Sequence, residues 1–473
     1  MMKPMLSLGW ALLVGATAVG ARAASWPMFR GPNGSGVAEG AKPPVQIGPD
    51  QGVLWKIDVP GSPSSPCVWG DRIFLTTFFG EKLETRAYDR SQGVLLWSQV
   101  APAKQLEDYH ATEGSPAAGT PATDGEVVVS YFGSAGLHCY EVGGKELWRH
   151  ELPVARIYGG FGSGTSPLIA GDRVILSRDV MDGPAIIALD RKTGRKLWEQ
   201  PRPDSFTSYS TPVVWNHDGM SEVVVAGAFS MKAYDPATGN ERWLLRGLPS
   251  STCTTPVVGD GYLFFAGWSP GKADAPFPTW ESRLAEWDKN GDGMLALEEF
   301  GWGPTLFRTG DTDKSGKIEV SEWNAFIEFA KKGENLLLCV RPGGRGDITA
   351  THVAWKSTRG LPYVASPLHY EGRIYLVKDG GLASCFRAGT GEPVYLQERI
   401  PGGAGSYYAS PVGADGRIYL ASLQGKVTVL EAGADQPVVL HQADFGERIA
   451  ATPALVGNHL YLRTWSRLYA FGP

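Results

Sequence analysis

The chain has 473 residues, of which 61 are glycine and 34 are proline, and its formal net charge is −5. This abundance of turn-forming residues favours many short strands over long helices. The chain is mildly acidic and has no basic run, so nothing argues for a nucleic-acid groove, and we expect no nucleic acid among its partners.

The first 23 residues have the pattern of a secretory signal peptide. Lys3 supplies a positive charge, residues 5–20 are apolar, and Ala21-Arg22-Ala23 is an A-x-A cleavage site. The apolar stretch is short for a membrane span. We therefore expect a signal peptide over residues 1–23, no membrane span after its cleavage, and an exported protein that is periplasmic or secreted.

A Ser-Pro or Thr-Pro dipeptide recurs eight times along the chain and predicts a repeat. The steps between successive prolines are 55, 46, 45, 44, 111, 44 and 42 residues. After each proline come an apolar strand, a tight turn and a second strand, as in "VVGDGYLFFAG" (257–267). Four strands in a period of about 45 residues are typical of a β-propeller blade. The prolines are Pro66, Pro121, Pro167, Pro212, Pro256, Pro367, Pro411 and Pro453.

An 11-residue pattern, with Ala, Gly and Trp at positions 1, 7 and 11, marks the outer half of several repeats. The small residue and the glycine leave a flat hollow, which we expect the indole of a neighbouring blade to fill. Two later copies, which begin at Cys385 and Val429, depart from the pattern, and we expect their blades to dock less regularly. The full copies are Ala87, Gly93 and Trp97; Ala188, Gly194 and Trp198; and Ala233, Gly239 and Trp243.

The last repeat has no fourth strand of its own, because the chain ends just after "RLYAFGP" (467–473). Near the start, "GVLWKI" (52–57) has the sequence of a fourth strand with no blade before it. If the two pair, the ring closes and its open sheet edge disappears. The predicted fold is all-β: an eight-bladed β-propeller over residues 24–473, with tryptophan-docking motifs and an N-terminal strand that closes the last blade.

These repeats resemble the tryptophan-docking propellers of the pyrroloquinoline quinone (PQQ) repeat family, and "SWPMFRGPNGSG" (25–36) looks like the leading segment of its exported bacterial members. The resemblance implies an eight-bladed ring and two kinds of role. Some members are PQQ-dependent dehydrogenases, which carry an adjacent Cys-Cys disulfide, an acidic base and calcium in the central channel. Others are cofactor-free outer-membrane assembly lipoproteins.

The cysteines depart from the enzyme pattern, because no two of them are adjacent. They are Cys67, Cys139, Cys253, Cys339 and Cys385. Three of them, Cys139, Cys339 and Cys385, align with the small slot of the docking pattern and fit there as packing residues. The departure argues against bound PQQ and against an enzyme, and no catalytic residue is assigned. A PQQ-dependent or PQQ-like oxidoreductase that uses the channel is the alternative.

Loops between fourth and first strands share one face of a propeller with the loops between second and third strands. On the other face the turns are tight, so the loop-rich face is the candidate binding surface. His110 lies in one of these loops, either near the channel mouth or in solvent. The aromatic residues of this face either bind a partner or fill the inner rim, and they are Phe161, Tyr209, Tyr363, Tyr407 and Tyr408.

Two segments match the 12-residue EF-hand loop, which needs oxygen ligands at positions 1, 3 and 5, glycine at 6, a backbone carbonyl at 7 and glutamate at 12. The predicted calcium ligands of the first loop are Asp288, Asn290, Asp292, Met294 and Glu299. Those of the second loop are Asp311, Asp313, Ser315, Lys317, Glu319 and Glu322. We therefore expect two Ca²⁺ sites, flanked by helices over 279–287 and 320–332.

The EF-hand pair interrupts the longest repeat step. From the proline to the small slot other blades have 17 to 21 residues, whereas 83 separate Pro256 from Cys339. The excess predicts an insertion over 275–333, between the second and third strands of blade five, on the loop-rich face. We expect an exported, monomeric, non-catalytic scaffold for protein, peptide or glycan, in which calcium orders the inserted arm or only stiffens it.

Overall fold

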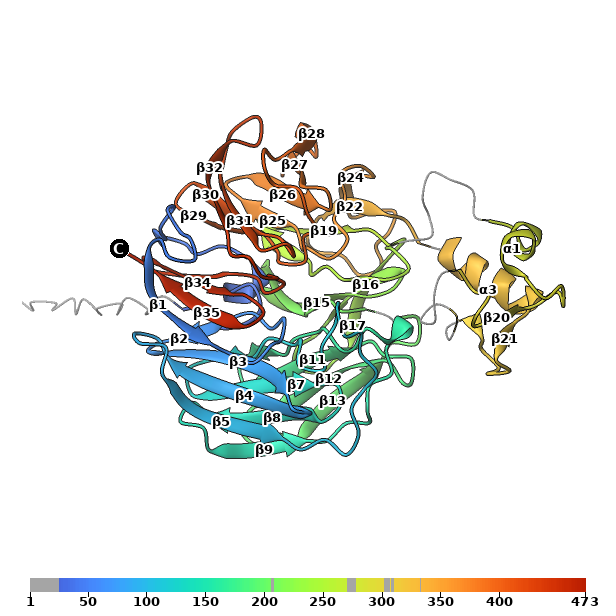
Figure 1. Ribbon diagram of the computed structural model, residues 1–473, viewed down its shortest axis with the longest axis horizontal. Helices are drawn as coiled ribbons and strands as arrows, with labels where there is room; N and C mark the ends of the chain where they lie inside the picture. Colours follow the sequence, from blue (N-terminus) through green and yellow to red (C-terminus); the bar gives the residue numbers. More distant parts are fainter. Residues whose placement is uncertain (1–24, 206–207, 270–277, 302–306, 308–309, 332) are drawn as a thin grey trace, which may run out of the picture.

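The computed structural model describes residues 25–205, 208–269, 278–301, 307, 310–331 and 333–473. The predicted signal peptide and parts of the predicted insertion lie outside this range. Within it, eight sheets stand around a central axis, and a small helical arm with α1 and α3 projects to one side (Figure 1). The expected eight-bladed propeller is therefore confirmed.

Each blade has four antiparallel strands, which in blades one to seven follow chain order from the axis outward. Blade one contains β2 (Cys67–Trp69), β3 (Arg72–Phe79), β4 (Lys82–Asp89) and β5 (Leu95–Ala101). Blade two contains β6 (Ala122–Thr123), β7 (Val127–Phe132), β8 (Gly136–Glu141) and β9 (Glu146–His150). Blade three contains β10 (Leu168–Ala170), β11 (Arg173–Arg178), β12 (Ala185–Asp190) and β13 (Lys196–Pro201). Blade four contains β14 (Val213–His217), β15 (Met220–Ala226), β16 (Ser230–Tyr234) and β17 (Glu241–Arg246).

The second half of the ring repeats this order. Blade five contains β18 (Val257–Gly259), β19 (Tyr262–Gly267), β22 (Leu336–Val340) and β24 (Val353–Ser357). Blade six contains β25 (Leu368–Tyr370), β26 (Arg373–Lys378), β27 (Leu382–Arg387) and β28 (Pro393–Arg399). Blade seven contains β29 (Val412–Ala414), β30 (Arg417–Ala421), β31 (Lys426–Glu431) and β32 (Val439–Asp444). Blade eight contains β33 (Ala454–Val456), β34 (His459–Arg463), β35 (Arg467–Phe471) and the N-terminal β1 (Val53–Asp58).

Two pairings finish the ring. β1 pairs antiparallel with β35, with Trp55 opposite Ala470, so the first strand completes the last blade as predicted. A short strand, β23 (Gly346–Asp347), adds to blade four by pairing parallel to β17. Both additions satisfy backbone groups that an open sheet edge would expose.

The Ser-Pro and Thr-Pro anchors form a closed belt of hydrogen bonds around the axis. In each anchor, the Ser or Thr donates its backbone N–H to the side-chain oxygen of the equivalent Ser or Thr in the next blade, at 2.9–3.2 Å. The proline that follows has no N–H of its own to satisfy. In order the belt runs Ser65, Thr120, Ser166, Thr211, Thr255, Ser366, Ser410, Thr452 and back to Ser65.

Tryptophans join the outer parts of neighbouring blades, as the 11-residue pattern predicts. A Cβ added to the docking glycine would lie 2.4–2.7 Å from the indole of the preceding blade, so only glycine leaves room for the ring. The indole N–H also donates to a turn carbonyl, at 2.8–3.1 Å. The pairs are Trp55 on Gly93, Trp97 on Gly144, Trp148 on Gly194, Trp198 on Gly239 and Trp355 on Gly391. The irregularity expected of the Cys385 copy is therefore absent at Gly391.

The interface between blades four and five departs from this scheme. The indole of Trp243 donates instead to Oε2 of Glu222, at 2.8 Å. This buried carboxylate is also 3.1 Å from His217 Nε2 and accepts from Arg345 at 3.1 Å. A buried charge is tolerated when its oxygens are fully hydrogen-bonded, and here the network takes the place of a docking glycine.

The segment that precedes β1 fills the centre of the ring. Its residues bond to Val68, Thr123, Val214 and Gly413, which belong to the innermost strands of blades one, two, four and seven. Each of these contacts falls two residues after a Pro anchor, so the segment lies on the tight-turn side of the belt. The short helix η1 (Pro32–Gly34) lies within it.

Candidate functional site

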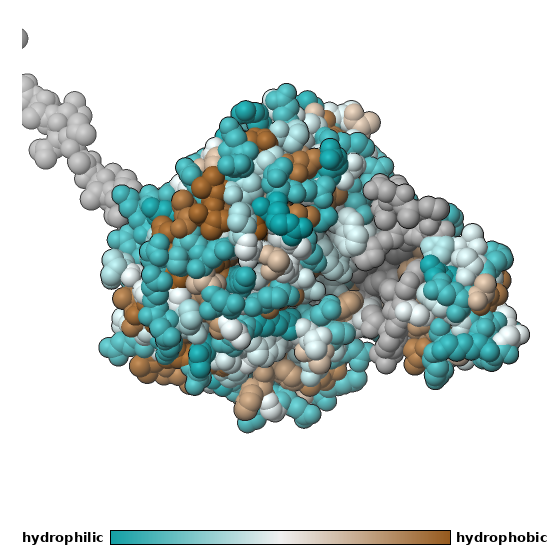
Figure 2. All heavy atoms as spheres, turned by 45° about the horizontal axis from the view of Figure 1, so that its top comes forward, coloured by the Kyte–Doolittle hydropathy of each residue, from teal (hydrophilic) through white to brown (hydrophobic). Residues whose placement is uncertain are grey.

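The EF-hand arm leaves blade five between β19 and β22, its second and third strands. A side-chain clasp joins the two ends of the insertion: the amide of Asn335 accepts from Ser269 N at 2.9 Å and donates to Ser269 O at 3.1 Å. The arm stands beside the ring, and its visible surface is mostly hydrophilic (Figure 2). Its first and last residues, 275 and 333 by the sequence, stay a prediction.

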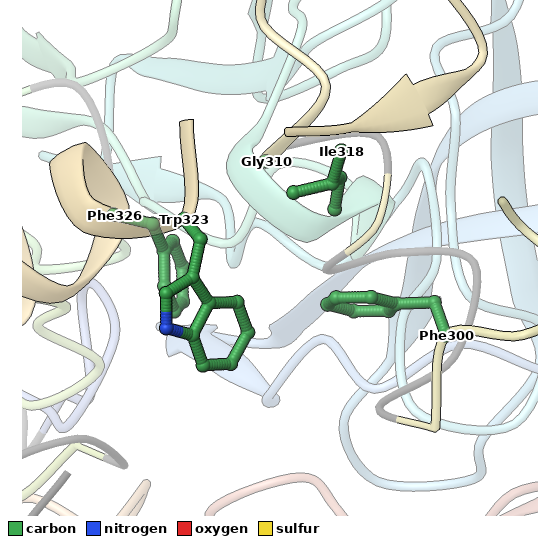
Figure 3. Close-up of a pocket in the computed structure, with 5 residues that line it drawn as sticks. All are labelled: Phe300, Gly310, Ile318, Trp323 and Phe326. Carbon is green, nitrogen blue, oxygen red and sulfur yellow. The ribbon is translucent and has the colours of Figure 1, made fainter. Parts of the chain in front are cut away.

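The arm has a hydrophobic core of its own. Helix α1 (Trp280–Trp287) begins at Thr279, whose side chain accepts from Ser282 N, and α3 (Val320–Lys331) follows the second loop. Between the loops, β20 (Leu295–Ala296) pairs antiparallel with β21 (Lys317–Ile318), so the two position-8 residues, Leu295 and Ile318, lie opposite each other. Phe300, Ile318 and Trp323 converge on a small apolar cavity beneath the loops (Figure 3). The buried members of this core are Trp280, Trp287, Leu295, Phe300, Phe307, Ile318, Trp323 and Ile327.

In the second loop the carboxylates converge. Ligand oxygens of Asp311, Asp313 and Glu322 lie within 4.8 Å of one another. One oxygen of Asp311, Oδ1, is buried and has no hydrogen-bond partner among the described residues. Ser315 Oγ lies 2.9 Å from the carbonyl of Lys317, so the atoms at positions 5 and 7 are adjacent. An unpartnered carboxylate oxygen inside a cluster of hard oxygen atoms fits a calcium ion.

The first loop has the same backbone frame. Glu299 accepts from Lys289 N and Asn290 N through Oε1, and from Ala296 N through Oε2. Glu322 repeats this in the second loop with Thr312 N, Asp313 N and Glu319 N. In the first loop Asp288 accepts from Gly291 N and Gly293 N, and Asp292 accepts from Met294 N at 2.9 Å. All eleven predicted ligand positions therefore fall on two paired loops.

One contact distinguishes the first loop from the second. Lys317, at position 7 of the second loop, places its Nζ 2.6 Å from Oδ2 of Asp292, at position 5 of the first. The hydrogen bond from this ammonium is the main cause that lowers the pKa of Asp292, and the same bond raises the pKa of Lys317. In the EF-hand pattern position 7 contributes only a backbone carbonyl, so the contact of the Lys317 side chain could not be predicted from the sequence.

The loop-rich face carries a second polar group at the channel mouth. Tyr408 donates to Glu113 at 3.3 Å, which joins loops of two blades that are not neighbours. The guanidinium of Arg448 lies 4.8 Å from the ring centre of Trp465. Its Nε and Nη2 are buried and have no hydrogen-bond partner in the part of the chain that the structure describes. Burial lowers the pKa of Arg448. This combination could hold the carboxylate of a planar ligand.

The predicted residues of this face are only partly at the mouth. Of the five aromatic residues Tyr408 takes part in the group just described, and Tyr363 lies against Trp268 with ring centres 5.4 Å apart. Tyr407 is buried and donates to Gly403 O at 2.6 Å, so it fills the rim. His110 lies beside Phe161, 5.7 Å between ring centres, and near Thr112. Neither Glu113 nor Arg448 carried a sequence signal.

A buried carboxyl, Glu107, fastens the long loop before blade two. It is 2 % exposed and accepts from Ser163 Oγ at 2.7 Å and from Ser163 N at 3.1 Å. Burial raises the pKa of Glu107 to about 8. Its Oε1 has no hydrogen-bond partner in the described structure, so the site favours the protonated acid.

The cysteines are all free thiols. Cys139, Cys339 and Cys385 are buried opposite Trp148, Trp355 and Tyr395 respectively, in the small slot of the docking pattern. Burial raises the pKa of the Cys139 thiol to about 12, and buried thiols of this kind are inert.

Comparison with known sequences separates the ring from the arm. The family model described as outer membrane protein assembly factor BamB matches residues 84–269, and the EF hand model matches residues 305–327. Quinohemoprotein alcohol dehydrogenase ADH IIB of Pseudomonas putida is 27% identical over 237 residues. That match covers 46% of this chain and only 31% of the relative.

Solved structures share the fold at low sequence identity. BamB from Moraxella catarrhalis superposes with a TM-score of 0.55 at 16% identity, over 89% of this chain and 99% of that one. A europium-containing methanol dehydrogenase gives a TM-score of 0.57 at 12% identity, over 95% of this chain and 98% of that one. No described helix has the length and apolar character needed to cross a bilayer. Residues 84–269 are thus similar to the assembly-factor family and residues 305–327 to EF hands, and the ring has the fold of an eight-bladed β-propeller.

Proposed function

We propose that this protein is an exported calcium-binding propeller that acts as a non-catalytic interaction scaffold. In this proposal residues 1–23 direct export, and residues 275–333 form an arm beside the channel mouth. Calcium binds both loops of the arm and orders it on the loop-rich face, where a protein, peptide or glycan would bind. The proposed protein is a monomer in the periplasm or outside the cell.

The proposal that the protein binds calcium rests on the geometry of the second loop. Its three convergent carboxylates and the unpartnered Oδ1 of Asp311 offer what calcium requires. Support for the scaffold part is the likeness of residues 84–269 to an assembly factor. The arm leaves the ring between the second and third strands of blade five, and binding residues lie more often on loops than on the strands that they join.

Calorimetric titration with calcium tests the proposal on the full mature chain. Wild type is expected to bind two ions, and Glu299→Ala and Glu322→Ala are each expected to bind one, because each removes the bidentate ligand of a single loop. The double variant should give no heat. Absence of binding to wild type, or unchanged binding to the double variant, would refute the calcium sites.

A PQQ-dependent oxidoreductase is the second candidate, and two observations favour it. The chain matches part of an alcohol dehydrogenase, and the unpartnered nitrogens of Arg448 suit an anionic planar cofactor such as PQQ. Against it stand the free, separated cysteines and Glu113, which places a carboxylate in the mouth. Addition of PQQ to purified protein decides between them: a bound chromophore and dye reduction with alcohols would establish the enzyme.

A further inference from the structure

The two calcium loops are not equivalent, because only one of them holds an internal cation. Lys317 reaches from β21 across the two-stranded sheet to Asp292 in the first loop. The corresponding position of the first loop is Met294, which has no charge to offer the second loop. In the described residues, the group of carboxylates that converges as a metal cluster is that of the second loop.

The ammonium of Lys317 faces the other acidic ligands of the first loop as well. Besides Asp292, the carboxylates of Glu299 and Asp288 raise the pKa of Lys317. A cation at this place would repel a calcium ion in the first loop and would have to release Asp292 before that residue could bind the ion. Because the lysine is 41% and the aspartate 29% exposed, solvent screens the pair and the effect is moderate.

We propose that Lys317 is a built-in counter-ion that weakens calcium binding to the first loop, so that the second loop fills first. This inference rests on the proposed calcium function and deepens it. The backbone carbonyl of Lys317 serves the second loop while its side chain restrains the first, so one residue sets the order of filling. The arm would then pass through a half-loaded state as calcium rises.

The test isolates the first loop in a Glu322→Ala chain, in which the second loop has lost its bidentate ligand. Lys317→Met in this background is expected to tighten calcium binding about two- to fivefold in calorimetry, the scale of one partly exposed ion pair. The gain should shrink at high potassium chloride, because salt screens the repulsion that the variant removes.

Lys289→Met is the matched control. It removes the same charge from position 2 of the first loop, and the ion pairs of the described residues include none with Lys289. Its gain in affinity should be clearly smaller than that of Lys317→Met. An equal gain, or no gain from Lys317→Met, would overturn the inference while leaving calcium binding itself intact.

If the arm of the Glu322→Ala chain does not fold, a second measurement replaces the first. In the wild-type background, Lys317→Met should increase the product of the two calcium association constants by the same factor, and Lys289→Met should not. If wild type binds no calcium at all, the proposed function fails, and that result is distinct from an equal response of the two lysine variants.

Discussion

At the scale of single residues, the blade interfaces depend on glycines that accept a neighbouring indole. Gly194 has a φ of +70°, and a Cβ there would meet Trp148 at 2.6 Å. Gly171 has nearly the same backbone, with a φ of +61°, but no described atom beyond its chain neighbours lies within 4 Å of an added Cβ. The two positions therefore separate the cost of a strained backbone from the cost of lost docking.

Gly194→Ala should lower the free energy of unfolding by about 2 kcal/mol more than Gly171→Ala, because only the first forces the indole out of its hollow. Denaturant unfolding of the two variants measures the difference. Equal losses would show that the glycine serves the turn alone and that the tryptophan adapts.

A second residue-scale prediction concerns pH. Burial raises the pKa of Glu107 from its ordinary value of 4.5 to about 8. Between these values the folded chain binds more protons than the unfolded chain, so this residue makes the free energy of unfolding fall as the pH rises. Glu107→Gln should remove that part of the pH dependence, a few kcal/mol at most by order of magnitude. Thermal melts of both proteins from pH 5 to pH 9 would contradict this if their difference stayed constant.

At the scale of elements, the hydroxyl belt explains why the repeat begins with Ser-Pro or Thr-Pro. Thr211 accepts from the backbone N–H of Ser166, and both are buried. Thr211→Val keeps the shape and leaves that N–H unsatisfied, which should cost about 1–3 kcal/mol of unfolding free energy. Thr211→Ser keeps the hydroxyl and should cost less. A larger loss in the serine variant would mean that packing, and not the belt, matters at this position.

The spacing of these elements was predictable from the sequence, and several of their contacts were not. The repeat of Thr211 and its counterparts located eight blades, and "GVLWKI" located the closing strand, because both recur locally with a fixed period. The partner of each hydroxyl lies one blade away, and the segment that precedes β1 bonds to six blades. Such contacts form only when the ring closes, so no local sequence pattern can predict them.

The candidate site shows the same division. The predicted calcium ligands stand at fixed positions in two short loops, so the sequence alone could propose all eleven. The hydrogen bond between Tyr408 and Glu113 and the pairing of Lys317 with Asp292 join residues that only the fold brings together. The buried nitrogens of Arg448 belong to no sequence motif. Likewise, the sequence pattern predicts that Trp243 packs on a glycine, whereas its indole donates to Glu222.

At the scale of the whole molecule, the protein combines a closed ring with an arm that has its own core. The ring is held by the belt, the docked indoles and the closing strand, none of which involves the EF-hand loops. The arm joins the ring through the clasp between Ser269 and Asn335. Calcium should therefore act on the arm and leave the stability of the blades nearly unchanged.

Hydrogen–deuterium exchange of the mature protein, with calcium and with a chelator, tests this account most directly. We predict that calcium protects peptides covering residues 288–299 and 311–322, that propeller strands exchange equally in both conditions, and that the Glu299→Ala/Glu322→Ala double variant loses the protection. Identical exchange of the arm in both conditions, or protection that persists in the double variant, would contradict the account.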